Sequence, residues 1–265
     1  MFKLRKKNTS ADDRIAPLVL HAAEGTLHRT FEPETVDSFR RTITDLSHSA
    51  DLPRRIAIIS ALKGEGVTYS TLALATVLAS DMNKSVCVVD LNWWSPSLAH
   101  QLDPVFNVKQ KRRRRKDPPL EPTAAAVELA SRPGVAQVVD GTASLDEALY
   151  ATDLPNLTLL SSGELPVARR PVLARSDGMK NLINELSERF DYLLFDIPAI
   201  LNSSDAIALA SYSDACCMVV RHGITPSTSV QRALDDVRHL RMLGVILNQV
   251  SIKTPRWIRE LIPQE

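Results

Sequence analysis

Residues 55–79 read RIAIIS, ALKGEGVT and YSTLALATVLA: an apolar run, a loop with two glycines, and an apolar segment rich in alanine and leucine. The run Arg55–Ser60 is typical of a strand that is buried on both faces of a parallel sheet. Residues 69–79 have the length and composition of a helix. A buried strand that leads through a glycine-containing loop into a helix predicts an α/β fold.

The same alternation of strands and helices continues along the chain. Short apolar runs predict further strands at residues 85–90, 157–160, 192–197, 215–220 and 244–247. Apolar positions at helical spacing predict helices at residues 34–48, 179–190, 205–212 and 228–240. Because the connections are short, the sequence predicts a doubly wound, mostly parallel sheet with helices on both faces, a three-layer α/β/α domain.

This domain is expected to span residues 34–250. Residues 1–33 mix charge with small polar residues, and we expect a basic, flexible N-terminal tail with some local helix. Residues 103–125 contain four prolines and a basic block, which is typical of an exposed insertion loop. Residues 251–265 are expected to form a C-terminal tail.

The overall composition excludes several classes of protein. Hydrophobic residues make up 44% and charged residues 24% of the chain, which excludes a mainly disordered chain, a collagen and a coiled-coil rod. No run of 18 apolar residues occurs, so the sequence predicts no membrane-spanning helix. The basic first residues are not followed by an apolar segment, so no secretory signal peptide is expected.

The charge of the chain is distributed unevenly. Although the net charge is only +1, residues 109–116 (KQKRRRRK), from Lys109 to Lys116, concentrate positive charge in the insertion. A solvated loop is one interpretation, and attraction to an anionic membrane surface, an acidic partner or a charged polymer is the other. Nucleic acid is disfavoured as a partner, because no reading helix or stacking module accompanies the block.

The C-terminal tail also has two interpretations. At helical spacing, one face of it would carry Trp257, Ile258, Leu261 and Ile262. This face would either dock onto the domain or form a membrane-contacting tip.

The loop after the first strand lies where α/β sheets bind ligands, beyond the carboxyl ends of the strands. Its glycines would let the backbone approach a phosphate, and the helix that follows would supply free N–H groups and a favourable dipole. The alternative is a tight strand-to-helix turn that merely uses glycine. The residues concerned are Lys63, Gly64, Glu65, Gly66, Val67, Thr68 and Tyr69.

The loop matches the phosphate-loop pattern G-x-x-x-x-G-K-[ST] only in part. Gly66 and Thr68 occupy the second glycine and the hydroxyl position, whereas Ser60 stands for the first glycine and Val67 for the lysine. That lysine places a cation on the β- and γ-phosphates, and valine has no charge to offer. Lys63 in the same loop is a candidate substitute.

Two further strands end in an acid. Asp90 follows the apolar run of the second strand, and Asp196 follows Leu193-Leu194-Phe195. Carboxylates at such an edge hold Mg²⁺ directly or through water, and the alternative is an acid that only caps the next loop. Because the carboxyl ends of parallel strands share one edge, we expect Thr68, Asp90 and Asp196 to converge.

Several segments together resemble the cytoplasmic ATPase domain of bacterial tyrosine kinases, of the deviant Walker-A superfamily that also contains MinD and ParA. The resemblance covers about residues 34–250. The segments are SALKGEGVT, VVDLNWWSPSL, YLLFDIPAILNSSDAIALA, CCMVVRHGIT, LGVILNQV, and in the middle of the chain SLDEAL and LTLLSSGELP.

The resemblance implies a P-loop NTPase fold that binds ATP or ADP with Mg²⁺. It implies a place in capsule or exopolysaccharide biosynthesis with a membrane-embedded polysaccharide co-polymerase or chain-length regulator, in the cytoplasm at the inner face of the cell membrane. The implied nucleotide contacts are residues 63–69 and Asn248, although a loop-capping role is an equal alternative for Asn248. Thr68, Asp90 and Asp196 would hold the metal, and the implied catalytic residues are Asp90 and Lys63.

The sequence departs from that family at positions that matter for catalysis. Besides Val67, the second acid after Asp90 is Asn92, and the arginines that usually follow it are Trp94 and Ser95. The oligomerisation pattern E-x-x-R-x-x-R survives only in part, so the oligomeric state stays open, and the tail holds no tyrosine.

These departures leave three hypotheses. The first is a pseudo-enzyme that regulates or scaffolds a membrane partner. The second is an active ATPase or tyrosine kinase that uses a substitute lysine. The third is a MinD- or ParA-like positioning ATPase on a membrane or on DNA.

Overall fold

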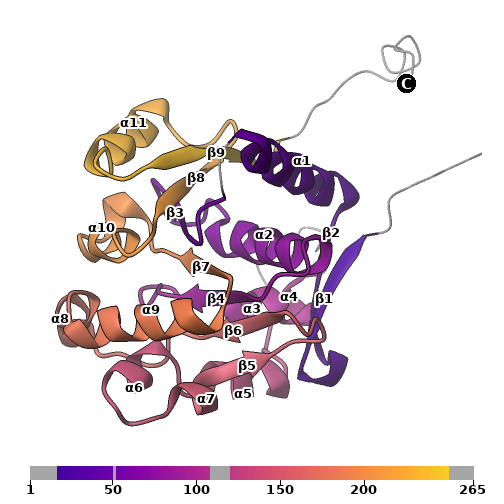
Figure 1. The fold of residues 1–265 in the computed structure, drawn as a ribbon, viewed down its shortest axis with the longest axis vertical. Helices are drawn as coiled ribbons and strands as arrows, with labels where there is room; N and C mark the ends of the chain where they lie inside the picture. Colours follow the sequence, from indigo (N-terminus) through magenta and orange to yellow (C-terminus); the bar gives the residue numbers. More distant parts are fainter. Residues whose placement is uncertain (1–16, 50–51, 108–119, 251–265) are drawn as a thin grey trace, which may run out of the picture.

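The computed structural model describes residues 17–49, 52–107 and 120–250. A seven-stranded sheet forms the centre of the molecule, with the strand order β5-β6-β4-β7-β3-β8-β9 (Figure 1). All neighbours in it pair in parallel except β5 and β6. The strands are β3 (Arg55–Ser60), β4 (Val86–Asp90), β5 (Leu149–Ala151), β6 (Leu157–Leu160), β7 (Tyr192–Asp196), β8 (Ala215–Arg221) and β9 (Met242–Asn248).

Helices cover the two faces of the sheet, which gives the expected three layers. The first face carries α1 (Pro33–Ser49), α2 (Val67–Asp81), α3 (Leu98–Leu102) and α5 (Ala124–Ser131), with the short α4 (Pro104–Asn107) after α3. The second face carries α6 (Val135–Val139), α7 (Leu145–Ala148), α8 (Arg170–Ala174), α9 (Asp177–Arg189), α10 (Asp205–Ala210) and α11 (Ser227–Asp236).

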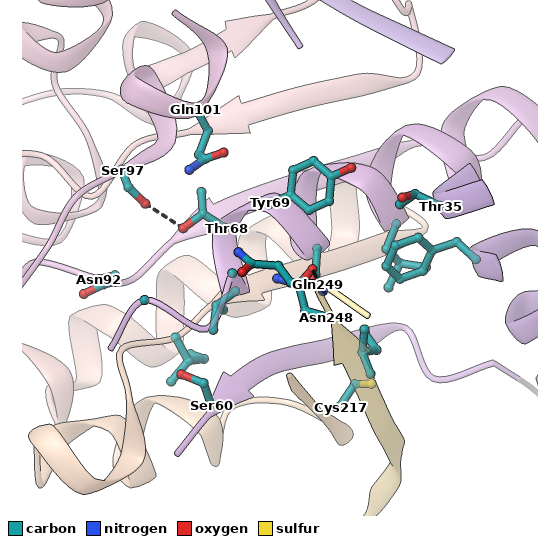
Figure 2. Close-up of a pocket in the computed structure, with 18 of the residues that line it drawn as sticks. Thr35, Ser60, Thr68, Tyr69, Asn92, Ser97, Gln101, Cys217, Asn248 and Gln249 are labelled. Atoms are coloured by element: carbon teal, nitrogen blue, oxygen red, sulfur yellow. Dashed lines mark hydrogen bonds between the residues drawn. The ribbon is translucent and has the colours of Figure 1, made fainter. Parts of the chain in front are cut away.

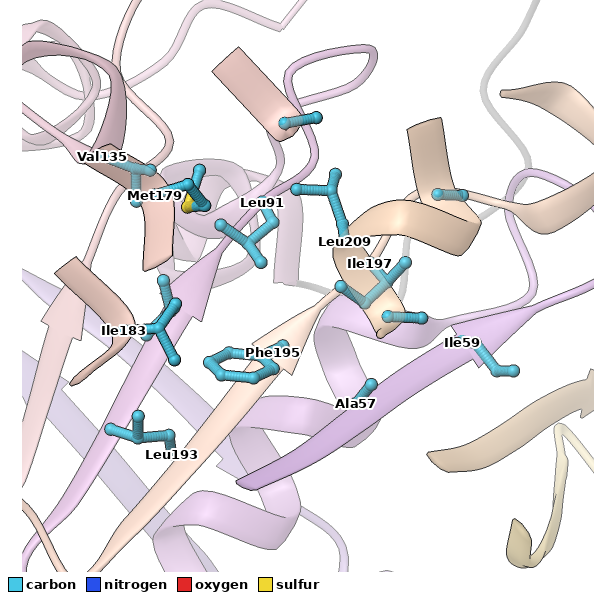
Figure 3. Close-up of a cluster of buried hydrophobic side chains, with 14 of the residues drawn as sticks. Ala57, Ile59, Leu91, Val135, Met179, Ile183, Leu193, Phe195, Ile197 and Leu209 are labelled. Atoms are coloured by element: carbon cyan, nitrogen blue, oxygen red, sulfur yellow. The ribbon is translucent and has the colours of Figure 1, made fainter. Parts of the chain in front are cut away.

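The continuous apolar runs are explained by burial on both sides. In β7, Leu193 and Phe195 point into the core of the second face, whereas Leu194 points into the core of the first face. Figure 3 shows Phe195 among side chains of α9 and α10, including Ile183 and Leu209. Parallel strands covered in this way show no polar alternation, which is why the sequence pattern identified them.

The doubly wound fold predicted from the sequence is confirmed. All six predicted strands and all five predicted helices are present, with ends shifted by a few residues. The pattern did not reveal β5 or the short helices between residues 98 and 174, because elements of three to eight residues carry too little periodicity.

The predicted flexible tail is wrong for its second half. An antiparallel hairpin of β1 (Leu18–Ala22) and β2 (Leu27–Phe31) precedes α1. Leu20, Leu27 and Phe31 are fully buried in the first-face core, so this segment is part of the domain. Its turn uses Gly25 at φ 87°, a conformation that favours glycine.

The insertion is ordered at both ends. Asp103 is buried and accepts hydrogen bonds from the backbone N–H groups of Val105 (2.9 Å) and Thr123 (2.8 Å), which holds the two ends together. α4 and α5 then begin inside the range expected to be a loop. The basic block at 109–116 and the tail at 251–265 lie outside the described residues. Within the described ranges, none of the helices is long and apolar enough to cross a membrane.

Candidate functional site

The loop from Ala61 to Gly66 connects β3 to α2 and depends on glycine at its end. Gly66 has φ 98°, in the left-handed region, and precedes the first residue of the helix. A Cβ atom at this position would lie 2.0 Å from Nδ2 of Asn248. The backbone conformation at Gly66 therefore favours glycine, and a side chain here would displace the amide of Asn248.

Glu65 braces the loop from within. Its carboxylate is buried and accepts hydrogen bonds from the backbone N–H groups of Ala61 (3.0 Å) and Leu62 (3.3 Å). The same carboxylate accepts a hydrogen bond from the hydroxyl of Thr225, in the connection from β8 to α11. The side chain of Glu65, expected to contact nucleotide, thus faces the protein, and Glu65 does not line the groove beside the loop.

Asn248 holds the loop from the other side. Its Nδ2 donates to the carbonyl of Glu65 at 2.8 Å, and its Oδ1 accepts from the N–H of Gln249 at 2.8 Å. Two roles were considered for Asn248, nucleotide contact and loop capping. These hydrogen bonds are those of a loop cap. No signal in the sequence pointed to Thr225, because its contact with Glu65 joins residues 160 positions apart.

The structure brings together the three residues that were expected to converge. β4 and β7 are neighbours, and their register places Asp90 beside Asp196. Thr68 Oγ1 donates to Asp196 Oδ2 at 2.5 Å and also lies 2.6 Å from Ser97 Oγ, the contact drawn in Figure 2. Asp90 accepts the backbone N–H of Asn92 at 2.8 Å.

Burial strongly perturbs the two carboxyl groups. Burial raises the pKa of Asp90 to about 7. Burial, and then the negative charge of Asp90, raise the pKa of Asp196 well above its usual range. One oxygen of Asp196, Oδ1, is buried without a hydrogen-bond partner among the described residues. Two adjacent buried carboxylates favour either a shared proton or a cation.

This donor set fits Mg²⁺. The ion prefers oxygen ligands such as carboxylates and hydroxyls, and usually keeps several waters. Asp196 offers a buried oxygen that has no partner in residues 17–49, 52–107 and 120–250, and the Thr68 hydroxyl lies beside its other oxygen. A divalent cation here would offset the repulsion between Asp90 and Asp196.

The loop lacks the lysine of the phosphate-loop pattern G-x-x-x-x-G-K-[ST]. Val67 occupies the first position of α2 and is almost buried, so the helix N-terminus has no lysine at this place. Lys63 in the same loop is exposed and makes no hydrogen bond or ion pair with the part of the chain that the structure describes.

The loop opens into a groove of about 2000 Å³ between α1, α2, β9 and the segment before α3. Figure 2 shows Tyr69, Thr68, Asn248 and Gln249 around it. A second cavity of about 620 Å³, with Asp90, Trp93 and Arg170 in its wall, lies beside the first and shares Pro96 with it. Asp90 therefore lines a different cavity from the loop.

The two tryptophans after Asp90 have different roles. Trp93 is buried in the second-face core and donates Nε1–H to the carbonyl of Ser162 at 2.8 Å. Trp94 is partly buried, lines the large groove, and has the guanidinium of Arg170 5.2 Å from its ring centre.

The chain is similar to known proteins in sequence and in fold. No family model matches the chain. The tyrosine-protein kinase CpsD of Streptococcus pneumoniae is 29% identical over 230 residues, which are 86% of this chain and 89% of that protein. The homologues of this chain are bacterial tyrosine kinases. YwqD of Bacillus subtilis is 26% identical and covers 82% of this chain.

Other relatives are much longer than this chain. The succinoglycan biosynthesis transport protein ExoP of Rhizobium meliloti is 26% identical over 94% of this chain, which spans only 29% of ExoP. The chain likewise spans 17% of the tyrosine-protein kinase Ptk of Acinetobacter johnsonii.

Solved structures show the same fold. The kinase domain of VpsO has a TM-score of 0.64 and 25% identity, and the match covers 82% of this chain and 97% of that domain. MinD of Pyrococcus horikoshii, solved with Mg-ADP, has a TM-score of 0.52 and 22% identity, with 80% of this chain and 78% of MinD covered. The fold is that of MinD- and ParA-like P-loop NTPases.

Proposed function

We propose that this chain is a tyrosine-kinase-like P-loop protein of capsule or exopolysaccharide biosynthesis with a degenerate nucleotide site. It would regulate or scaffold a membrane-embedded polysaccharide co-polymerase, working at the inner face of the membrane. The observation that carries the proposal is Val67, which stands at the phosphate-lysine position beside an otherwise assembled group of Thr68, Asp90 and Asp196.

Electrostatics explains why we propose a low phosphoryl-transfer activity for this chain. Phosphoryl transfer depends mainly on positioning and on cations that stabilise the transferred group. The backbone of the loop and the N-terminus of α2 can still receive phosphate, but valine removes one fixed positive charge from the β- and γ-phosphates. We therefore propose weak binding of ATP or ADP and little or no turnover.

The metal-binding part of the site would be retained. Thr68 and Asp196 would hold Mg²⁺, and Asp90 would lie behind them as a second negative charge. When bound, the ion would supply charge neutralisation for the phosphates. The pKa of about 7 for Asp90 suits a group that can accept a proton near neutral pH.

The partner is proposed from the relatives. ExoP is named as a succinoglycan biosynthesis transport protein, and CpsD and YwqD as tyrosine kinases. A chain that keeps this fold and loses the phosphate lysine would act through binding instead of phosphorylation. The basic residues Lys109 to Lys116 would add attraction to the anionic membrane surface.

Calorimetric titration of the full chain with Mg-ATP and Mg-ADP tests the proposal. We expect affinities in the micromolar range or weaker and no measurable turnover. Val67→Lys is expected to tighten Mg-ATP binding at least tenfold, because it restores the missing cation, whereas Val67→Met, of similar length without charge, is not. Sub-micromolar binding with robust turnover by the unaltered chain would rule out a degenerate site.

A second candidate is an active ATPase or kinase in which Lys63 replaces the missing lysine. The exposed position of Lys63 in the loop favours this candidate. Transfer of radiolabelled phosphate from ATP, to the chain itself or to a partner, would then be lost in Lys63→Ala and in Asp196→Ala. Equally low transfer by the unaltered chain and both variants would exclude it.

A further inference from the structure

The hairpin of β1 and β2 carries an arginine on its inward face. Leu27, Arg29 and Phe31 share this face of β2, because successive side chains of a strand point to opposite sides. Leu27 and Phe31 are fully buried in the first-face core. Arg29, between them, is half-buried and lines the groove into which the loop at residues 61–66 opens. A charged group at such a position gives up part of its hydration, which an anion in the groove would compensate.

Arg29 packs on the first turn of the helix that follows the loop. Its guanidinium carbon lies 4.7 Å from the ring centre of Tyr69, which is a cation–π contact. Tyr69 is the third residue of α2 and directly follows Thr68. The N–H groups in the first turn of a helix have no carbonyl partner within the helix, so this turn is where the proposed nucleotide site would receive phosphate. The guanidinium therefore lies beside the phosphate-receiving turn.

The short helix α3 contacts Arg29 as well. α3 packs on β2, and Nη1 of Arg29 donates to the carbonyl of Gln101 at 3.4 Å. The side-chain oxygen of Gln101, Oε1, is buried without a hydrogen-bond partner among the described residues. Figure 2 shows this side chain beside the same groove as Thr68 and Tyr69. The Tyr69 ring and the Gln101 carbonyl are both neutral, so these two contacts orient the guanidinium and leave its charge in place.

Electrostatics favours an anion beside Arg29. Burial lowers the pKa of its guanidinium, because the charged form loses hydration. A negative charge nearby stabilises the charged form again. Arginine suits phosphate in particular, since its planar guanidinium can donate two parallel hydrogen bonds to one phosphate group.

We propose that Arg29 binds the phosphate chain of a nucleotide in this groove and supplies, from the hairpin, part of the positive charge that Val67 does not provide. This role of Arg29 depends on the proposed nucleotide site. The contact that carries it is the one between Arg29 and Tyr69, next to Thr68 in the first turn of α2. The hairpin would thus take part in ligand binding in addition to its place in the core.

Calorimetric titration of the full chain with Mg-ADP and with Mg-pyrophosphate tests this role. Arg29→Gln, which removes the charge and keeps a polar side chain, is expected to weaken the binding of both about tenfold, the loss of one charge-assisted hydrogen bond. Arg29→Lys keeps the charge and is expected to stay within about threefold of the unaltered chain. Arg40→Gln is the matched control, because Arg40 is paired with Asp81 and does not line the groove, and it should leave both affinities unchanged.

The outcomes separate this role from the nucleotide site itself. Mg-ADP affinity that is the same in Arg29→Gln and in the unaltered chain would overturn the role of Arg29 and leave the nucleotide site standing. Weaker binding of Mg-ADP with unchanged binding of Mg-pyrophosphate would place Arg29 at the base or the ribose and overturn the phosphate contact. Absence of Mg-ADP binding to the unaltered chain would overturn both the role and the site.

Chemical modification of the unaltered chain gives a second measurement that needs no variant. Saturating Mg-ADP is expected to slow the reaction of Arg29 with phenylglyoxal at least fivefold and to leave the reaction of Arg40 unchanged, as measured by mass spectrometry of the peptides. Equal rates at Arg29 with and without Mg-ADP would overturn the proposal, even if Arg29→Gln proved difficult to fold.

Discussion

Thr68 donates its hydroxyl hydrogen to Asp196 across 2.5 Å, and this contact joins the first turn of α2 to the carboxyl end of β7. The other oxygen of Asp196 is buried without a partner among the described residues, and Asp90 lies beside it in register. Without a cation, the fold therefore holds two carboxyl groups in a place where ionising both is unfavourable.

The first prediction concerns pH. The folded pKa values of Asp90 and Asp196 are raised, so between the unfolded value near 3.8 and about 7 the native state binds more protons than the unfolded chain. The metal-free chain should therefore lose stability as pH rises from 4.5 to 7.5. In Asp90→Asn, the loss of stability with rising pH should be smaller. Thermal unfolding in the presence of a chelator measures both, and a stability that rises through this range would contradict the two raised values.

The second prediction concerns the metal. At pH 7.5, millimolar Mg²⁺ should raise the unfolding temperature, because an ion that binds only the native state stabilises it by mass action. Asp196→Asn should remove this response, since the amide keeps the shape of the side chain but not its charge. Asp205→Asn, a buried acid paired with Arg175 elsewhere, is the matched control and should retain it. If Mg²⁺ still raises the unfolding temperature of Asp196→Asn, the ion binds at another site.

Much of this site could be predicted because it depends on topology. A buried strand that ends in an acid must place that acid at the common carboxyl edge of the sheet, so Asp90 and Asp196 could be placed before their contact was known. Thr68 follows from the same logic, one residue after the start of α2.

The remaining parts depend on contacts between distant segments. Thr225 reaches Glu65 from the connection after β8, and no local pattern marks it. The hairpin of β1 and β2 was missed because each strand has only five residues, and its charged and polar exposed positions resembled a tail. The position of β9 at the edge of the sheet could be recognised only when the strand order was known.

The third prediction separates the two reasons for glycine in the loop. Gly66 and Gly64 both have positive φ values, 98° and 85°, but a Cβ at Gly64 meets nothing within 4 Å. Gly64→Ala should destabilise the chain by about 1 kcal/mol, from backbone strain alone. Gly66→Ala should cost about 3 kcal/mol, because strain adds to displacement of the Asn248 side chain. Urea unfolding measures the difference, and equal losses would show that Asn248 moves away freely.

The fourth prediction concerns the brace between Glu65 and Thr225. Glu65→Ala removes the acceptor for two N–H groups of the loop, those of Ala61 and Leu62, and for the Thr225 hydroxyl. Each buried donor left without a partner costs about 1–3 kcal/mol, so a loss of roughly 3 kcal/mol is expected. Thr225→Val removes only the hydroxyl and should cost about 1 kcal/mol, whereas Thr225→Ser should be nearly neutral.

A double-mutant cycle shows whether the two residues act as one unit. If they do, the loss in Glu65→Ala combined with Thr225→Val should be smaller than the sum of the single losses, by about 1 kcal/mol. The brace also fixes the backbone that would receive phosphate, so Glu65→Ala should weaken Mg-ADP binding more than Thr225→Ser does. Strictly additive losses, together with unchanged Mg-ADP affinity in Glu65→Ala, would mean that the brace stabilises the fold without shaping the loop.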